Sequence, residues 1–269
     1  MDIGLFGDRF WVTAATVAGR RGENQDSMFW LAVSGGVVRR NGPSGPADPA
    51  PDPRGDLFVS VVCDGMGGLP DGAAASDLAV KALEGWALSD PMEDIDSAIQ
   101  SFADAVSEAE RRLIEEHPGS GTTVSAMLAV DDQWASVHLG DSRCYVLWED
   151  HMWRSRDHSP VESMFREGLI SEEEMNDHPL ANIVSRYMGG GFFGSISVTR
   201  VPPGWDRLAL CTDGAFGYMP PSDFEELLRG CGSARDLAES ALERGSTDNV
   251  TAVTVLRSSE RRSGPSRVR

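Results

Sequence analysis

Apolar runs broken at intervals by glycine and aspartate dominate the pattern of this chain. The clearest run is 57–63 (LFVSVVC), where β-branched, aromatic and long apolar side chains predict a strand buried on both faces. Similar runs predict a strand pair over 28–38, with a hairpin turn at Ser34-Gly35-Gly36. Further strands are expected at 10–17, 124–130, 134–140, 143–148, 207–212 and 250–256.

Helical periodicity interrupts these strands. Residues 71–88 and 94–116 carry apolar side chains at helical spacing, which predicts two consecutive amphipathic helices covering one face of a sheet. Shorter helices are expected at 223–228 and 234–244. The segment 160–188 is expected to be a mostly helical excursion from the sheets.

The composition is that of a folded protein. Of 269 residues, 41% are hydrophobic and 25% are charged. We expect one domain over residues 1–257. The Pro- and Gly-rich segment 41–55 predicts a mobile, exposed loop without a catalytic role, and the polar residues 258–269 predict a disordered tail.

The charge balance narrows the classes of partner. Asp and Glu number 42 against 24 Lys and Arg, a formal net charge of −18, which argues against general binding to nucleic acid or an anionic membrane. No apolar stretch approaches the roughly 20 residues that span a bilayer. Acidic Asp2 and Asp8 stand where a secretory signal carries positive charge, so we interpret the N-terminus as mature sequence. Four cysteines without paired spacing favour buried thiols, and together these features predict a soluble, cytoplasmic protein.

Four aspartates stand at or beside the ends of predicted strands: Asp64, Asp141, Asp213 and Asp248. One such residue is most often only part of a turn. Four carboxylates that converge would repel one another and raise each other's pKa, and divalent cations would remove that penalty. An all-oxygen ligand set favours Mg²⁺ or Mn²⁺ over Zn²⁺.

Other polar residues near the strands allow two interpretations. Arg21 and Asp26 are close enough in sequence to face one pocket, where arginine could fork onto phosphate oxygens, or they form an ordinary surface pair. His138, His158 and His178 are widely spaced, which favours structural roles over metal ligation.

Seven short motifs, taken in order, resemble the metal-dependent protein phosphatases of the PP2C (PPM) family in its bacterial form. The match runs from about Arg21 to Leu256. The resemblance implies an α+β fold, a four-layer α-β-β-α sandwich of two antiparallel sheets flanked by helices. The motifs are Arg21 with Asn24-Gln25-Asp26, Asp64-Gly65-Met66-Gly67-Gly68, Ser120-Gly121-Thr122-Thr123, Gly140-Asp141-Ser142-Arg143, Asp157-His158-Ser159, Thr212-Asp213-Gly214 and Asp248-Asn249.

The resemblance also implies a metal centre of two Mn²⁺ or Mg²⁺ ions. Asp64 matches the acid that bridges the two ions, and the Gly65 carbonyl matches a ligand of one of them. Asp213 and Asp248 match ligands of the other ion. Asp141 matches the acid that, with Asp213, holds a third and weaker ion.

Further positions match residues around the substrate in this family. Arg21 matches the arginine that binds the substrate phosphate, and Asp26 matches the acid that orders metal-bound water. Residues 160–188 match the variable flap beside the active site. Gln25 stands where many members carry Glu, and Met66 stands where eukaryotic members carry a His proposed as general acid. Here we expect water to protonate the leaving alkoxide.

The implied function is hydrolysis of phosphoserine and phosphothreonine in proteins by a water that two metal ions activate. Such an enzyme would act as a monomer and oppose a bacterial serine/threonine kinase. Two alternatives stay open: a non-catalytic module that binds phosphoproteins, and a phosphatase of small regulators of transcription. An aspartyl-phosphate hydrolase would need an Asp-x-Asp pair at a strand end, which Val62-Cys63-Asp64 lacks.

Overall fold

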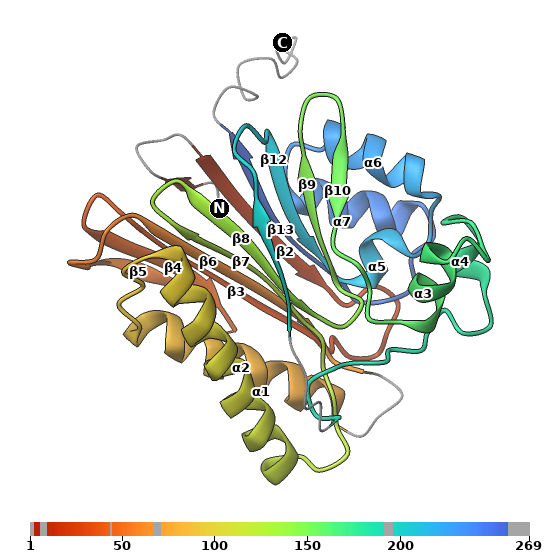
Figure 1. Cartoon of the computed structure of the whole chain (residues 1–269), viewed down its shortest axis with the longest axis horizontal. Coiled ribbons are helices and arrows are strands. Elements are labelled where there is room, and N and C mark those ends of the chain that lie inside the picture. The colour runs from red at the N-terminus through yellow and green to blue at the C-terminus, as the bar shows by residue number, and fades with distance from the viewer. Residues whose placement is uncertain (1–2, 6–9, 44, 67–70, 191–195, 258–269) are drawn as a thin grey trace.

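Two antiparallel sheets packed face to face form the centre of the molecule (Figure 1). The computed structural model describes residues 3–5, 10–43, 45–66, 71–190 and 196–257. The six-stranded sheet has the order β1 (Ile3–Leu5), β2 (Phe10–Val17), β13 (Val250–Arg257), β12 (Arg207–Cys211), β9 (Arg143–Leu147), β10 (Met152–Arg154). The seven-stranded sheet has the order β11 (Ser197–Val201), β8 (Gln133–Leu139), β7 (Val124–Val130), β6 (Leu57–Asp64), β3 (Asp26–Ser34), β4 (Val37–Gly42), β5 (Gly45–Pro51).

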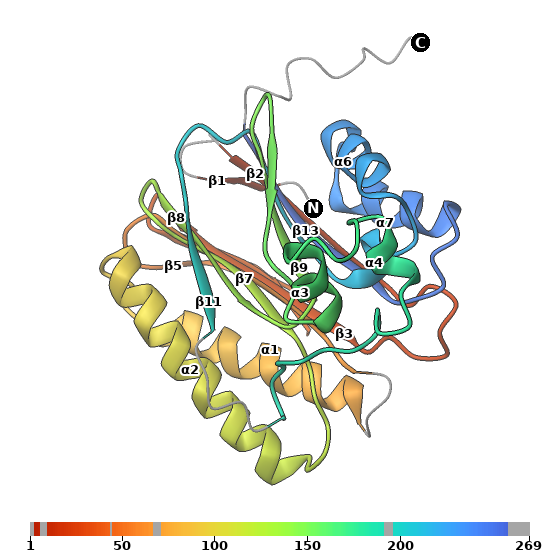
Figure 2. The same cartoon turned by 45° about the vertical axis from the view of Figure 1, so that its right-hand side comes forward.

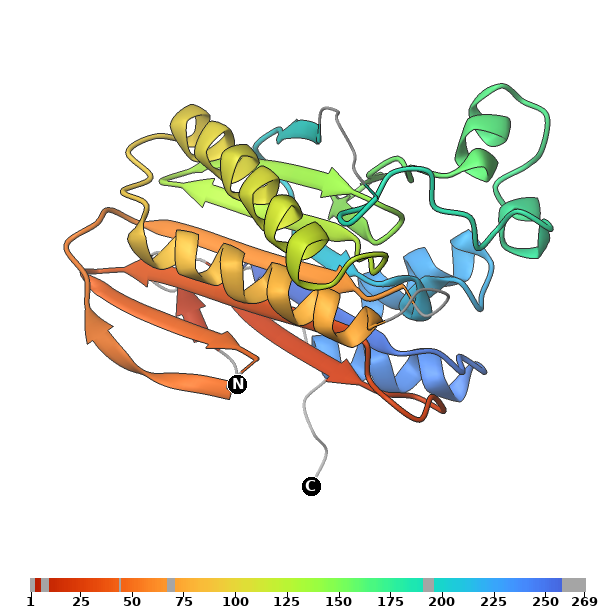
Figure 3. The same cartoon turned by 90° about the horizontal axis from the view of Figure 1, so that it is seen from below.

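Helices cover the outer faces of both sheets. α1 (Gly72–Ser89) and α2 (Ile95–Glu116) lie side by side over the seven-stranded sheet (Figure 3). On the other sheet lie α5 (Asp213–Phe216), α6 (Pro221–Gly230) and α7 (Ala234–Glu243). The expected α+β sandwich of four layers is therefore confirmed.

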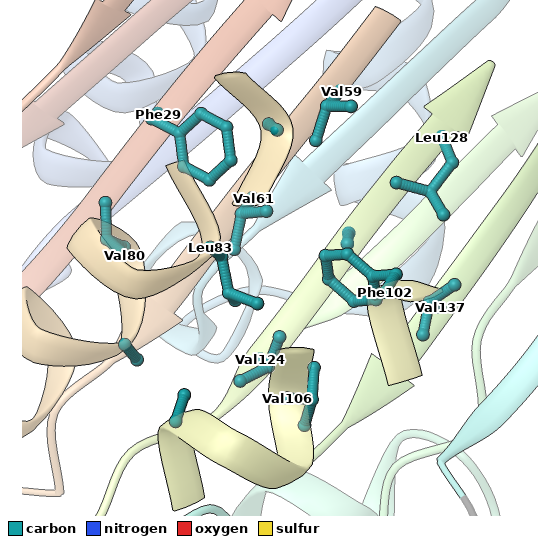
Figure 4. Packing of buried hydrophobic residues seen from close by; sticks show 14 of the residues in the cluster. Phe29, Val59, Val61, Val80, Leu83, Phe102, Val106, Val124, Leu128 and Val137 are labelled. Carbon is teal, nitrogen blue, oxygen red and sulfur yellow. The ribbon is translucent and has the colours of Figure 1, made fainter. Parts of the chain in front are cut away.

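Three apolar layers hold the sandwich together, and β6 contributes to two of them. Phe58 and Val62 point into the layer between the sheets. Val59 and Val61 point the other way and pack against α1 and α2 through residues such as Phe102 (Figure 4). Successive strand residues face opposite sides, so a strand with apolar side chains at nearly every position fits only in the interior of a layered fold.

The prediction for residues 41–55 was wrong in part. This segment contains β5, which pairs with β4 across a register shift between Val38 and Arg40. β5 lies at the edge of its sheet, where only one side needs backbone donors, so a strand with three prolines is tolerated there. The expected exposure is present, because most of β5 faces solvent.

The expected helical excursion over 160–188 was also wrong in part. Only α3 (Pro160–Arg166) and α4 (Glu174–Asp177) are helical there. Figure 2 shows these short helices close to each other, and in Figure 3 they stand apart from the two sheets. α3 starts where the sequence allows it, with the Ser159 side chain accepting the Glu162 N–H and Pro160 in the first turn. Strands β1 and β11 and the short helix α5 had no counterpart among the predicted elements.

Other expectations have mixed outcomes. Strands at 10–17 and 124–130 are present with the predicted bounds, and all four cysteines are buried free thiols. Of the helices described, none is both long and apolar enough to cross a membrane. The predicted tail 258–269 lies outside the described residues, and the single domain over 1–257 stays a prediction.

Candidate active site

Strand ends from both sheets meet at one end of the sandwich and bring acidic side chains together. Asp64 closes β6 and lies directly opposite Asp26, the first residue of β3. Asp213 follows β12, and Asp248 comes shortly before β13. Asp141 lies where the chain passes from β8 in one sheet to β9 in the other. Apart from Asp26, these aspartates line one cavity of about 430 Å³.

The turn after β6 is held rigidly. The Asp64 N–H donates to Thr123 Oγ1 at 2.9 Å, and the Thr123 N–H donates to the Asp64 carbonyl at 2.9 Å. The Gly65 N–H donates to the Gln25 carbonyl at 3.0 Å, and a Cβ on Gly65 would lie 2.2 Å from the Gly72 carbonyl oxygen. Any larger residue would clash at this position. With glycine there, the Gly65 backbone itself lines the cavity. Gly67 and Gly68 lie outside the described residues.

The clustered carboxylates raise each other's pKa. Burial is the largest cause of the raised pKa of Asp64, and the charges of Asp26, Asp213, Asp141 and Asp248 add to it. Burial and the charge of Asp213 raise the pKa of Asp141 to about 8. Burial and the charge of Asp248 raise the pKa of Asp213. Without cations, part of this cluster holds protons at neutral pH.

Asp26 is buried beside the cluster with one oxygen unsatisfied. Thr212 donates to Asp26 Oδ2 at 2.8 Å. The Thr251 hydroxyl is also close to Asp26, but its hydrogen bond is to Thr16 Oγ1 at 2.7 Å. Asp26 Oδ1 is buried and has no hydrogen-bond partner among the described residues. Burial, together with the charges of Asp213 and Asp248, raises the pKa of Asp26 to about 7. A buried acceptor of this kind needs a water or a ligand.

Arg21 lies at the rim of the cavity and binds Asp248. Its Nε and Nη2 donate to the two Asp248 oxygens at 2.8 and 2.6 Å, while its side chain stays 56% exposed. The sequence suggested a shared pocket for Arg21 and Asp26, but the partner of Arg21 in the structure is Asp248, a candidate metal ligand. Gly19, at a φ of +59°, lets this loop approach closely, since a Cβ there would lie 2.0 Å from the Asp248 carbonyl oxygen.

Asn249 is a site residue to which the sequence analysis gave no role. Its Oδ1 accepts the Gln25 N–H at 2.8 Å, and its Nδ2 donates to the carbonyls of Ala18 and Glu23, both at 2.9 Å. The side chain therefore holds the loop that carries Arg21 against the start of β13. The available signal was an asparagine between an acid and the mostly apolar run 250–256.

The donors present are of the kind that Mg²⁺ and Mn²⁺ prefer. They are all oxygens, their mutual repulsion raises several pKa values, and one buried carboxylate oxygen has no partner in the described residues. In the part of the chain that is described, no group of three or more His, Cys, Asp or Glu side chains is arranged so that it could hold a metal ion. Arg21 binds both oxygens of Asp248, so a metal ion would share this carboxylate with Arg21 or displace it.

A larger cavity of about 720 Å³ adjoins the acidic one and shares Arg21 and Asp141 with it. Its walls come from the 160–188 segment, through Met175 and Asn176, and from α5 and the residues after it, through Phe216 and Tyr218.

Buried ion pairs fasten the 160–188 segment to the six-stranded sheet. Arg143 forks onto Asp157 with distances of 2.8 and 2.7 Å. Arg154 contacts Glu162 at 2.8 Å and Glu172 at 2.6 Å. These partners are buried or half-buried, and removing one would leave an uncompensated charge. This network was not predicted, because its members belong to different elements and no local spacing rule connects them.

Comparisons with known proteins agree with the fold described above. The sequence profile described as Protein phosphatase 2C matches residues 51–244. The serine/threonine phosphatase Stp of Listeria monocytogenes is 34% identical over 222 residues, which cover 74% of this chain and 84% of the relative. The Stp1 structure from Staphylococcus aureus shares the fold, with a TM-score of 0.76, 24% identity and coverage of 91% and 94%. The catalytic domain of the phosphatase PstP, solved with two manganese ions, has a TM-score of 0.69, 26% identity and coverage of 92% and 97%.

Proposed function

This chain belongs to the protein phosphatase 2C family, and from that membership we propose that it hydrolyses phosphoserine and phosphothreonine in proteins. The observation that carries the proposal is the meeting of four strand-end aspartates at one cavity, with Arg21 at its rim. The named activity of the relatives supports an enzyme over a non-catalytic module that binds phosphoproteins. A small regulator of transcription stays among the candidate substrates.

The aspartates are proposed to hold Mn²⁺ or Mg²⁺. Asp64 would serve two ions, the Gly65 carbonyl would serve one of them, and Asp213 and Asp248 would serve the other. Asp141, with Asp213, would hold a third. When bound, such ions supply positive charge that lowers the pKa of a water molecule and offsets charge on the phosphoryl oxygens. The raised pKa values of Asp64, Asp141 and Asp213 support these assignments.

Arg21 is proposed to bind the phosphoryl group of the substrate. Its fork already spans two carboxylate oxygens, and a phosphoryl group offers an oxygen pair to the same two N–H donors. Binding the phosphoryl group through these same two donors would require Arg21 to release Asp248, whereas the Nη1 N–H groups take no part in that pair.

Asp26 is proposed to orient the attacking water, and Met66 stands near the leaving group without being able to protonate it. Asp26 Oδ1 accepts a hydrogen bond from the attacking water, while Thr212 keeps Oδ2 in place. The water oxygen forms a bond to phosphorus and the water releases one proton to solvent, while the bond from phosphorus to the Ser or Thr oxygen breaks and that oxygen takes up a proton. Met66 lines the cavity but has no proton to give, so that proton comes from solvent.

The biological setting is proposed on less direct grounds. We expect phosphorylated proteins as substrates, a serine/threonine kinase as the opposing enzyme, and a monomer as the working form. Four buried free thiols support a reducing compartment such as the cytoplasm.

The test is turnover of a phosphoserine peptide and a phosphothreonine peptide by the purified chain, with Mn²⁺, with Mg²⁺ and with EDTA. We expect phosphate release with either metal and loss of at least about 10³-fold with EDTA. Full activity in EDTA would contradict the metal assignment. Tight Mn²⁺ binding with no turnover of any phosphopeptide would favour the binding module.

A further inference from the structure

His158 joins three separate parts of the chain through hydrogen bonds. Its Nδ1 accepts the Gly140 N–H at 3.1 Å, and its own N–H donates to the Gly140 carbonyl at 2.7 Å. Its Nε2 lies 2.9 Å from the hydroxyl of Ser197, the first residue of β11. Its carbonyl accepts the Ser185 N–H at 2.7 Å. The residue is buried, so these contacts form in a water-poor environment.

The Gly140 end of this arrangement leads directly to the acidic cavity. Gly140 has a φ of +117°, and a Cβ there would lie 2.7 Å from the Thr123 side chain. Thr123 Oγ1 lies 2.7 Å from Ser142 Oγ and accepts the Asp64 N–H. Asp141 stands between Gly140 and Ser142, so both of its chain neighbours are held. This turn holds the backbone of Asp141 and so fixes the direction in which its side chain leaves the chain.

The other end leads to the flap, residues 160–188. His158 comes directly before Ser159, the N-cap of α3, and it binds Ser185 where the flap returns. One residue therefore holds both stems of the flap and the turn that carries Asp141.

We infer that His158 is a positioning residue, which fixes Asp141 for metal binding through the Gly140 amide and couples that turn to the flap. This inference rests on the proposed function, since Asp141 matters only if the acidic cavity holds cations. His158 itself touches neither the cavity nor a reacting group in this assignment, because it acts through the backbone of Gly140.

Histidine suits this position because one ring offers an acceptor and a second polar atom on opposite sides. Nδ1 must be unprotonated to accept the Gly140 N–H, and burial lowers the pKa of His158 to about 3, which keeps the ring neutral. Asparagine places an acceptor near the position of Nδ1, whereas glutamine reaches toward that of Nε2. The two substitutions therefore separate the contact with Gly140 from the contact with Ser197.

The first experiment measures amide hydrogen exchange at Gly140 in the metal-free chain. We expect H158N to keep the wild-type protection and H158Q to lose at least tenfold of it. H138Q is the matched control, because the His138 ring packs on His158 at 4.7 Å but makes no hydrogen bond to Gly140 in the described residues. Equal protection of Gly140 in H158N and H158Q would overturn the inference.

The second experiment counts bound Mn²⁺ from the electron paramagnetic resonance signal of the free ion. Losing a residue that orients a metal ligand typically costs about 10- to 100-fold in metal affinity. We expect H158Q to weaken the lowest-affinity Mn²⁺ by about tenfold, H158N to restore it, and H138Q to leave it unchanged. In a D141N background, H158Q should have no further effect. Effects of H158Q and D141N that simply add would show a general structural role and contradict the inference.

These readouts separate the two proposals. A wild-type chain that binds Mn²⁺ but hydrolyses no phosphopeptide would sink the proposed function, and the exchange and binding data would still decide the role of His158. Near-ultraviolet circular dichroism of each variant confirms that the fold is retained. If H158Q does not fold, H158N against H158L, which has a similar shape but no acceptor for the Gly140 N–H, provides the same comparison at Gly140.

Discussion

β6 serves two regions of opposite character within a few residues. Val61 packs in the layer under α1 and α2, where apolar side chains are fully buried and complete their contacts within the protein. Asp64 ends the same strand among carboxylates that raise its pKa. The first region completes its contacts within the protein, whereas the second holds like charges together that a cation would balance. One continuous strand therefore carries both part of the apolar core and the unsatisfied charge of a candidate site.

The largest effect should come from the acidic end. Asp64→Asn removes the charge of the proposed bridging ligand, and we expect phosphopeptide turnover to fall by about 10³-fold or more. The melting temperature of the metal-free protein should stay unchanged or rise, because one source of repulsion is gone. Asp213→Asn should behave in the same way. Wild-type rates in either variant would refute the assignment.

The apolar layer should respond in the opposite sense. Phe102 lies on α2 and its side chain is fully buried against the sheet. Phe102→Ala should lower the free energy of unfolding by about 3–5 kcal/mol, as cavity-forming changes do. Turnover per folded molecule at low temperature should change little. Urea denaturation measures the loss, with exposed Gln100→Ala on the same helix as the control. A stability change below about 1 kcal/mol would show that this layer is not what holds the sandwich together.

The pH dependence of stability should sharpen the contrast. Folding raises the pKa of Asp26 to about 7 and of Asp141 to about 8, so the folded state binds protons that the unfolded state has released. Their contribution is fully present below about pH 4 and is lost as pH rises through 7 to 8. Thermal melts of the metal-free protein should therefore show stability from these groups falling between pH 4 and pH 8. Saturating Mn²⁺ should remove that decline, and a decline of equal size with Mn²⁺ would contradict metal binding at these groups.

The smallest effect concerns Arg21 and metal affinity. Arg21→Ala frees both oxygens of Asp248, but an ion pair this exposed is worth at most about 1 kcal/mol. Calorimetry should therefore show Mn²⁺ binding tighter by no more than about fivefold, while phosphopeptide turnover falls. The neighbouring exposed Arg20→Ala makes the same change in net charge without touching that pair. Weaker Mn²⁺ binding in Arg21→Ala would mean that the arginine helps to organise the site.

The sequence predicted best what local patterns determine. Val124–Val130 is apolar at every position except Ser125 and has ordinary strand length, and the structure has a strand with those bounds. β5 was missed because proline normally excludes a strand, and its place at a sheet edge, which permits proline, is a tertiary fact. The flap was assigned too much helix because contacts across the fold, such as that of Glu172 with Arg154, hold its irregular part, and helical spacing does not show them.

The site divides in the same way. Aspartates after apolar runs indicated where Asp64 and Asp213 would lie, because strand ends of a layered fold meet at its edges. The contact of Arg21 with Asp248 joins residues 227 positions apart, and no spacing rule indicates it. The bonds of Asn249 to the Arg21 loop were invisible for the same reason.

The acidic residues are drawn from both halves of the sandwich, with Asp26 and Asp64 on one sheet and Asp213 and Asp248 at strands of the other. A chain in which only one half has formed therefore presents an incomplete set of ligands. Tight capture of cations would then mark the last stage of assembly, so a newly made molecule stays inert until its two halves have docked.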